Sequence, residues 1–205
     1  MKKLIYLSSI VLLIGLLSCG SQQQTEESQK ETIELTTEMA QVYTLQAREI
    51  VQATFQALSS SLMQAMSYGG VPYALEFCNV EALPITDSVA THFDADISRL
   101  ALKNRNPENY PAGRDEEILQ WYQLQFESGK PLNDTLIQYD DEHLAYFAPI
   151  MLAEQCLACH GTPGNELSLE NHQYIQRFYP ADKAVGFAVG DLRGMWRIGF
   201  KFASN

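Results

Sequence analysis

The sequence has few basic residues, and this scarcity excludes whole classes of partner. Lys and Arg number 14 in 205 residues, whereas Asp and Glu number 25, so the formal net charge is −11. Nucleic acids and anionic lipid surfaces bind proteins that carry a surplus of positive charge, so neither is an expected partner. A basic docking protein would suit the chain better. No isolated pair of carboxylates indicates acid–base catalysis.

Long hydrophobic stretches and internal repeats are also lacking. The main apolar run, residues 4–17, is too short to span a bilayer comfortably as a permanent helix. It follows Lys2 and Lys3 and ends at Ser18-Cys19, a pattern that resembles the lipobox of bacterial lipoproteins. We expect residues 1–18 to be a lipoprotein signal peptide. Cys19 would then carry the lipid that anchors the exported chain to a membrane, on the periplasmic or cell-envelope side. An ordinary secretory signal cut nearby is the alternative.

Cysteine is scarce as well, but two of the four cysteines form an informative motif. Cys156-Leu157-Ala158-Cys159-His160 is the C-x-x-C-H attachment signature of c-type haem. On one helical turn, each thiol can add to a different haem vinyl group, and the histidine that follows can ligate the iron. We therefore predict one covalently bound haem c on Cys156 and Cys159, with His160 as an axial ligand. A thioredoxin-like thiol pair and structural zinc are the alternatives, but the sequence shows neither a βαβ context nor a second pair of zinc ligands.

Cys78 is the one cysteine left without a task, because Cys19 is assigned to lipid and the other two to haem. A single cysteine in an apolar run is usually buried and inert. Here it is also a candidate for the sixth iron ligand, in competition with an open site. Methionine or histidine ligands are further alternatives, at Met63, Met66, Met151, Met195, His92, His143 and His172.

The rest of the chain predicts an α+β domain. Residues 19–32 are almost wholly polar and indicate a flexible tether, which leaves residues 33–205 as the domain. Apolar residues then recur at helical spacing from Met39 to Ala65, and Gly69-Gly70 with Pro72 predicts the end of this long helix. A shorter helix from Pro72 to Cys78 is expected next.

The second half of the chain has strand patterns. We expect strands over 96–103, over 136–139 and over 143–150, and a helix over 116–128. The clearest strand is the last, in which Trp196, Ile198, Phe200 and Phe202 alternate with polar residues after a turn over 190–194. Together these elements predict an antiparallel sheet with a long N-terminal helix and flanking helices.

Four motifs follow one another along the chain. They are Ala74-Leu75-Glu76-Phe77-Cys78-Asn79, Arg105-Asn106-Pro107-Glu108-Asn109-Tyr110-Pro111, Cys156-Leu157-Ala158-Cys159-His160-Gly161 and Gly186-Phe187-Ala188-Val189-Gly190-Asp191-Leu192-Arg193-Gly194. In this order they resemble the Tll0287-like haem domain, over roughly residues 35–203. The resemblance implies a PAS-like fold and one covalent c-type haem with unusual axial ligation by His and Cys. On this chain those two ligands would be His160 and Cys78.

Arg105 lies in the matching loop, where it is a candidate either for pairing with a haem propionate or for holding the turn. Further propionate candidates are Arg99, Lys103, Lys183 and Arg193, each of which is otherwise a solvated surface charge. Tyr146 and Phe147 are expected to pack either on the haem ring or in the core of the sheet.

The expected function is redox sensing or low-potential electron transfer by a membrane-tethered c-type haem protein. Since the sequence contains no output module, we expect a separate redox or signalling protein as the partner. The alternatives are a peroxidase-like haem enzyme with a displaceable sixth ligand and a passive haem-binding protein. An enzyme would also need a distal acid–base residue.

Overall fold

The structure is a computed structural model that describes residues 35–201. The predicted signal peptide, Cys19 and the tether lie outside the described residues. Within the described part of the chain, no helix is both long enough and apolar enough to cross a membrane.

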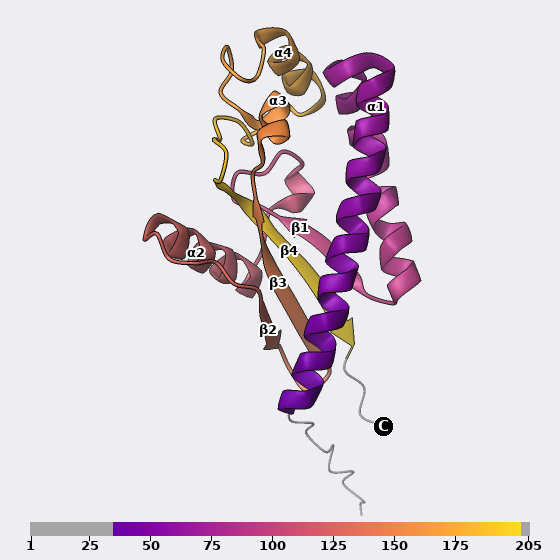
Figure 1. The fold of residues 1–205 in the computed structure, drawn as a ribbon, viewed down its shortest axis with the longest axis vertical. Coiled ribbons are helices and arrows are strands. Elements are labelled where there is room, and N and C mark those ends of the chain that lie inside the picture. The colour runs from indigo at the N-terminus through magenta and orange to yellow at the C-terminus, as the bar shows by residue number, and fades with distance from the viewer. Residues whose placement is uncertain (1–34, 202–205) are drawn as a thin grey trace, which may run out of the picture. The chain divides into compact units, whose positions relative to one another are not determined.

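Helix α1, Thr37–Phe93, consists of two arms that meet at a pair of glycines. The Thr36 side chain caps the first arm, residues 37–68, by accepting a hydrogen bond from the Met39 amide at 3.2 Å. Gly69 and Gly70 leave the helical conformation, and Gly70 takes φ 66° and ψ −158°, which favours glycine strongly. The second arm, residues 71–93, then runs back beside the first (Figure 1).

The predicted end of the first helix at Gly69-Gly70 is confirmed, but the predicted length of the next helix is wrong. The second arm does not stop at Cys78 and continues to Phe93, through Pro84. It ends only at Asp94, where φ is 50° and the amide donates to the Ala90 carbonyl. The extra length survives because Val89, Ala90 and Phe93 pack against the core, and this burial outweighs the hydrogen bond lost at proline.

Four strands form one antiparallel sheet, which confirms the predicted α+β class. They are β1 Asp96–Leu100, β2 Thr135–Gln138, β3 His143–Met151 and β4 Leu192–Lys201, in the order β1-β4-β3-β2. Strand β4 begins inside the turn predicted over 190–194. Gly194 allows this, because a Cβ there would lie 2.2 Å from the Leu100 carbonyl oxygen on β1. The PAS-like description stays a prediction.

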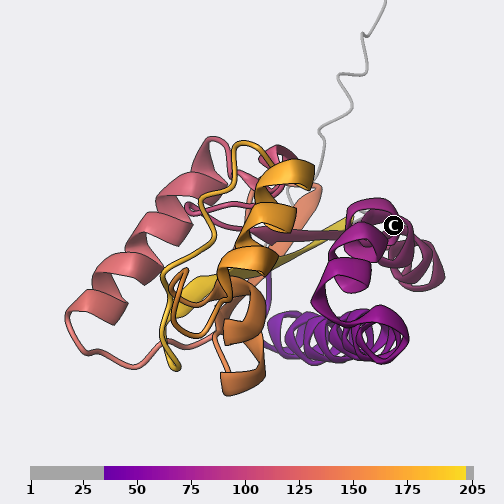
Figure 2. The same cartoon turned by 90° about the horizontal axis from the view of Figure 1, so that it is seen from above.

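The two faces of the sheet are covered by different helices (Figure 2). Along β3, Leu144 and Tyr146 face the first arm of α1, whereas Ala145 and Phe147 face α2, Arg114–Glu127. Tyr146 and Phe147 therefore belong to the core of the sheet. The cluster against α2 also buries Met195 completely.

The chain between β3 and β4 forms one end of the domain, above the sheet in Figure 1. The 3-10 turn η2, Glu154–Cys156, leads directly into the short helix α3, Leu157–His160. Helix α4, Leu169–Phe178, follows, and its Ile175 packs together with Leu167, which precedes the helix, on the start of the second arm. Helix α4 was not predicted from the sequence, although the Ser168 side chain caps it by accepting a hydrogen bond from the Asn171 amide.

Candidate functional site

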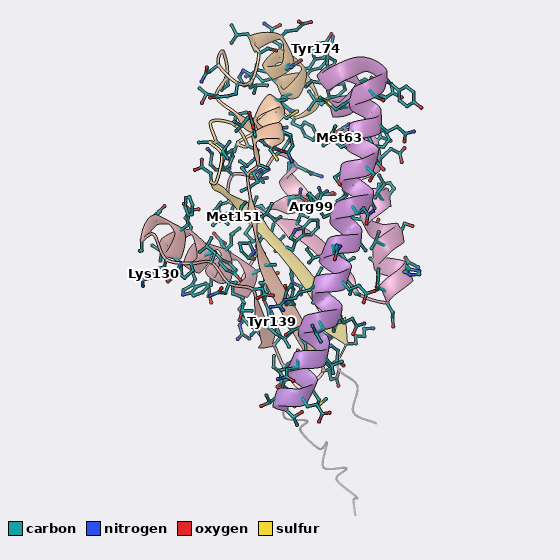
Figure 3. All side chains as sticks on the ribbon, in the orientation of Figure 1. Met63, Arg99, Lys130, Tyr139, Met151 and Tyr174 are labelled. Carbon is teal, nitrogen blue, oxygen red and sulfur yellow. The ribbon has the colours of Figure 1, made fainter. Side chains whose placement is uncertain are left out.

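A cavity with two lobes, of about 320 and 260 Å³, lies where α1, the turn at α3 and the ends of β1 and β4 meet. Both volumes are of the order found for ligand pockets. In Figure 3, Met63 and Arg99 mark the sides that α1 and β1 contribute. Both lobes are lined by Leu62, Cys78, Ala82, Arg99, Asn109, Cys156, His160 and Arg193.

The five leading site residues within the described part of the chain, namely Cys78, Arg105, Cys156, Cys159 and His160, all line this cavity. Cys78, Cys156 and His160 line both lobes, and Cys159 and Arg105 line the larger one. The fold thus brings together residues from the second arm of α1, from the loop after β1 and from the C-x-x-C-H turn.

The C-x-x-C-H turn has the local structure that its sequence predicts. Helix α3 places Cys156 and Cys159 one turn apart, and it ends where the Gly161 amide donates to the Leu157 carbonyl at 2.8 Å. A Cβ at Gly161 would lie 2.7 Å from that same carbonyl oxygen, so no larger residue fits. Both cysteines are free thiols, and burial raises the pKa of Cys159.

His160 is held in the form that a metal ligand requires. Its Nδ1 lies 2.7 Å from the Ala184 carbonyl oxygen. A carbonyl only accepts hydrogen bonds, so Nδ1 carries the proton and donates, and the lone pair of Nε2 remains for another partner. Burial, reinforced by the charges of Arg105 and Arg193, holds the pKa of His160 well below its ordinary value, so the imidazole is neutral.

Cys78 projects from the second arm into both lobes. Burial raises the pKa of its thiol, while the positive charges of Arg99 and Arg105 act in the opposite direction. The thiol is thus close to cations that would stabilise a thiolate once an additional positive partner, such as a metal ion, is supplied.

The cavity is cationic. Arg99 and Arg193 line both lobes, and none of the residues 35–201 that line them is an Asp or a Glu. Burial, followed by repulsion from Arg105, lowers the pKa of Arg193 to about 10. Burial likewise lowers the pKa of Arg99, whose guanidinium has no hydrogen-bond or ion-pair partner among the described residues. Two guanidinium groups on a wall to which residues 35–201 contribute no carboxylate leave positive charge unneutralised, so the site fits an anionic group.

Arg105 holds the C-x-x-C-H turn in place. Its Nε donates to Oδ1 of Asp182 at 3.1 Å, and its Nη2 donates to the carbonyl oxygens of Cys159 at 2.7 Å and Ala184 at 3.2 Å. The pairing of Arg105 with a propionate stays a prediction. Lys103 is also engaged, since its Nζ donates to the Val185 carbonyl at 2.8 Å.

The structure separates the remaining candidates for an iron ligand. Met63 and Met66 line the larger lobe and Met151 the smaller, whereas Met195 belongs to the core under α2. The three histidines predicted as alternatives, His92, His143 and His172, line neither lobe. Among residues 35–201, no group of three or more His, Cys, Asp or Glu side chains clusters as a site for a bare metal ion.

The segment before β4 that contains Gly186 and Phe187 contacts the site, which was not predicted from the sequence. Gly186 and Phe187 donate backbone hydrogen bonds, each 3.0 Å long, to the carbonyls of Gly161 and His160. The ring of Phe187 meets the His160 imidazole edge-on, with 6.3 Å between centroids. In the sequence, the only sign of this role is that Gly186-Phe187 begins one of the four motifs that resemble the family, and the motif says nothing about what these residues contact.

Residues 21–200 match the family described as Tll0287-like, Tll0287. The chain belongs to this family. The solved structure titled "Crystal structure of the cyanobacterial heme-protein Tll0287" is similar, with 24% sequence identity and a TM-score of 0.55. The alignment covers 83% of this chain and 99% of that one, and it shows that the two chains share this fold. No curated protein is significantly similar to the chain.

Proposed function

We propose that this member of the Tll0287-like family binds one haem c covalently through Cys156 and Cys159, with His160 as an axial iron ligand. One observation carries the proposal: both thiols and a neutral His160 with a free Nε2 line the same cationic cavity. The other members of the cavity wall fit as well, because two haem propionates would supply the anions that Arg99 and Arg193 lack.

Each chain residue has a definite task in this proposal. The S–H of Cys156 and that of Cys159 would each add across one vinyl C=C, so that sulfur bonds to carbon and the thiol proton goes to the neighbouring carbon. His160 would donate its Nε2 lone pair, with the ring held by the bond to Ala184. The bound haem iron would supply one-electron chemistry between its ferric and ferrous states.

We propose the thiolate of Cys78 as the other axial ligand. Support comes from its position in both lobes beside His160, from the nearby charges of Arg99 and Arg105, and from the ligation that the family resemblance implies. Met63 and Met66 line the same lobe and are the competing ligands. A thiolate stabilises ferric iron, so this ligation would give a lower midpoint potential than His/Met ligation.

The site supports redox sensing or low-potential electron transfer with a separate protein partner better than it supports enzymatic chemistry. A peroxidase-like enzyme needs a distal acid–base residue, and among residues 35–201 no carboxylate and no second histidine lines either lobe. Export and a lipid on Cys19 would tether the chain to the membrane and would put the haem in the compartment where bacteria attach haem c.

Expression of the chain with a bacterial cytochrome c maturation system tests this proposal. The haem should remain on the polypeptide through denaturing electrophoresis, and acid acetone should not extract it. Replacing both cysteines, as Cys156→Ala with Cys159→Ala, should abolish covalent attachment, whereas Cys78→Ser should retain it. Haem that acid acetone extracts from the unaltered chain would contradict the proposal.

A further inference from the structure

The Ala184 carbonyl oxygen receives two hydrogen bonds at once. His160 donates to it from Nδ1 at 2.7 Å, and Arg105 donates to it from Nη2 at 3.2 Å. The amide of Ala184 in turn donates to Oδ1 of Asp182 at 2.9 Å, and that oxygen also accepts from Nε of Arg105 at 3.1 Å. The ion pair of Arg105 and Asp182 therefore holds the backbone of Ala184 through both its carbonyl, which orients His160, and its amide.

This arrangement is built into the interior. Ala184 is fully buried, and the side chains of Arg105 and Asp182 are 12% and 4% exposed. Two backbone hydrogen bonds fix the loop that carries Asp182. The Asp182 amide donates to the Tyr179 carbonyl at 3.0 Å, and the Lys183 amide donates to the Asn104 carbonyl at 3.0 Å. A buried ion pair of this kind has a defined geometry and is only weakly screened by solvent.

We infer that Arg105 and Asp182 are a positioning pair that tunes how strongly His160 donates electrons to the haem iron; this inference rests on the proposed function. A carbonyl that already accepts from a guanidinium is a poorer acceptor for Nδ1–H. The imidazole therefore keeps more of its neutral character and donates less strongly through Nε2. Arg105 acts through Ala184 and needs no contact with the haem.

The two members of the pair predict opposite effects on the midpoint potential. Arg105→Gln removes a positive charge and makes the Ala184 carbonyl a better acceptor for Nδ1–H, and both changes stabilise ferric iron, so the potential should fall. Asp182→Asn keeps the side-chain acceptor for the Ala184 amide but leaves Arg105 unopposed, so the potential should rise. We expect the ferrous-to-ferric ratio at a fixed applied potential to change by about tenfold in each direction. Arg105→Lys should recover most of the loss.

Potentiometry of the haem-loaded variants, with thermal unfolding and resonance Raman spectra, tests this inference. A merely structural pair would loosen the site in both variants and move the potential the same way, which would overturn the inference. A change in the propionate bending band in Arg105→Gln, absent from Asp182→Asn, would assign Arg105 to a propionate and overturn it too. Arg177→Gln, on the exposed surface of α4, is the matched control and should move neither readout.

Nitrogen NMR of the full-length chain expressed without haem separates this inference from the proposed function. His160 should be protonated at Nδ1 in the unaltered chain, and Arg105→Gln should shift the Nδ1–H resonance by strengthening its bond to Ala184. An unchanged resonance would overturn the positioning role even if haem binds. A chain that shows the shift but takes up no haem would contradict the proposed function alone.

Discussion

Two opposing effects act on the pKa of the Cys78 thiol. Burial raises this pKa, and the guanidinium groups of Arg99 and Arg105 lower it. Haem iron that binds Cys78 would favour the thiolate, because a bound metal ion stabilises the deprotonated form of a coordinating thiol. Cys78→Ser should therefore change the ferric EPR g-values and the Soret band of the haem-loaded protein and should raise its midpoint potential.

The control for Cys78→Ser is Met66→Leu. Met66 lines the same lobe, and leucine has nearly the volume of methionine, so the change removes the sulfur without altering the packing much. It should leave the ferric spectrum unchanged. If Cys78→Ser has no spectral effect and Met66→Leu alters the spectrum, methionine is the ligand, and the electron-carrier function gains over the sensor.

Arg99 is expected to reverse its effect on stability when haem binds. Without haem, its guanidinium has no ion-pair partner among the described residues, so Arg99→Gln should stabilise the haem-free chain by about 1 kcal/mol. With haem, the same change would remove a propionate partner and should destabilise the protein by about 1–3 kcal/mol. Thermal or denaturant unfolding of both forms measures the difference. Destabilisation of the haem-free chain would show that Arg99 has a structural role.

At the scale of elements, the reversal of α1 positions Cys78. Gly70 has φ 66° and ψ −158°, a conformation that residues with a Cβ rarely adopt, and the second arm departs from it towards the cavity. Gly70→Ala should destabilise the protein by about 2 kcal/mol, measured by urea unfolding, and should weaken the spectral signature of Cys78 ligation.

Gly129→Ala is the comparison for this prediction. Gly129 also has a positive φ, 66°, but it follows α2, away from the cavity, and a Cβ there meets no atom within 4 Å. Gly129→Ala should lower the free energy of unfolding by about 1 kcal/mol and leave the haem spectrum unchanged. Equal effects of the two changes on ligation would contradict the role assigned to the reversal.

Most of the site could be predicted from the sequence because its chemistry depends on local spacing. The C-x-x-C-H turn needs only five consecutive residues, and Gly69-Gly70 followed by Pro72 is a local signal for the end of a helix. The extension of the second arm to Phe93 and the existence of α4 depend on burial against distant segments, which periodicity alone does not reveal. The bonds of Arg105 to Asp182 and Ala184 join residues more than seventy positions apart, so no local pattern encodes them.

For the whole molecule, the anchor remains a prediction from the sequence, because Cys19 lies outside the described residues. Mass spectrometry of the natural protein should find acyl groups on Cys19. Cys19→Ser should release the protein from membranes, and we expect it to leave haem content and unfolding temperature unchanged. Continued partition of Cys19→Ser with membranes would argue against a lipid anchor.

Ligation by Cys78 would have a mechanical consequence, because the helix breaks at Gly69-Gly70 and the ligand lies beyond that break, on the second arm of α1. Cys78 and His160 are roughly 80 positions apart, and a cross-link that closes a loop of this length removes chain entropy worth up to about 4.5 kcal/mol from the unfolded state. If the iron releases the Cys78 thiolate on reduction, this cross-link is lost, and the second arm of α1 is then held only by its packing. The arrival of one electron would then be transmitted as mobility of a surface helix, in a form that a partner protein can recognise.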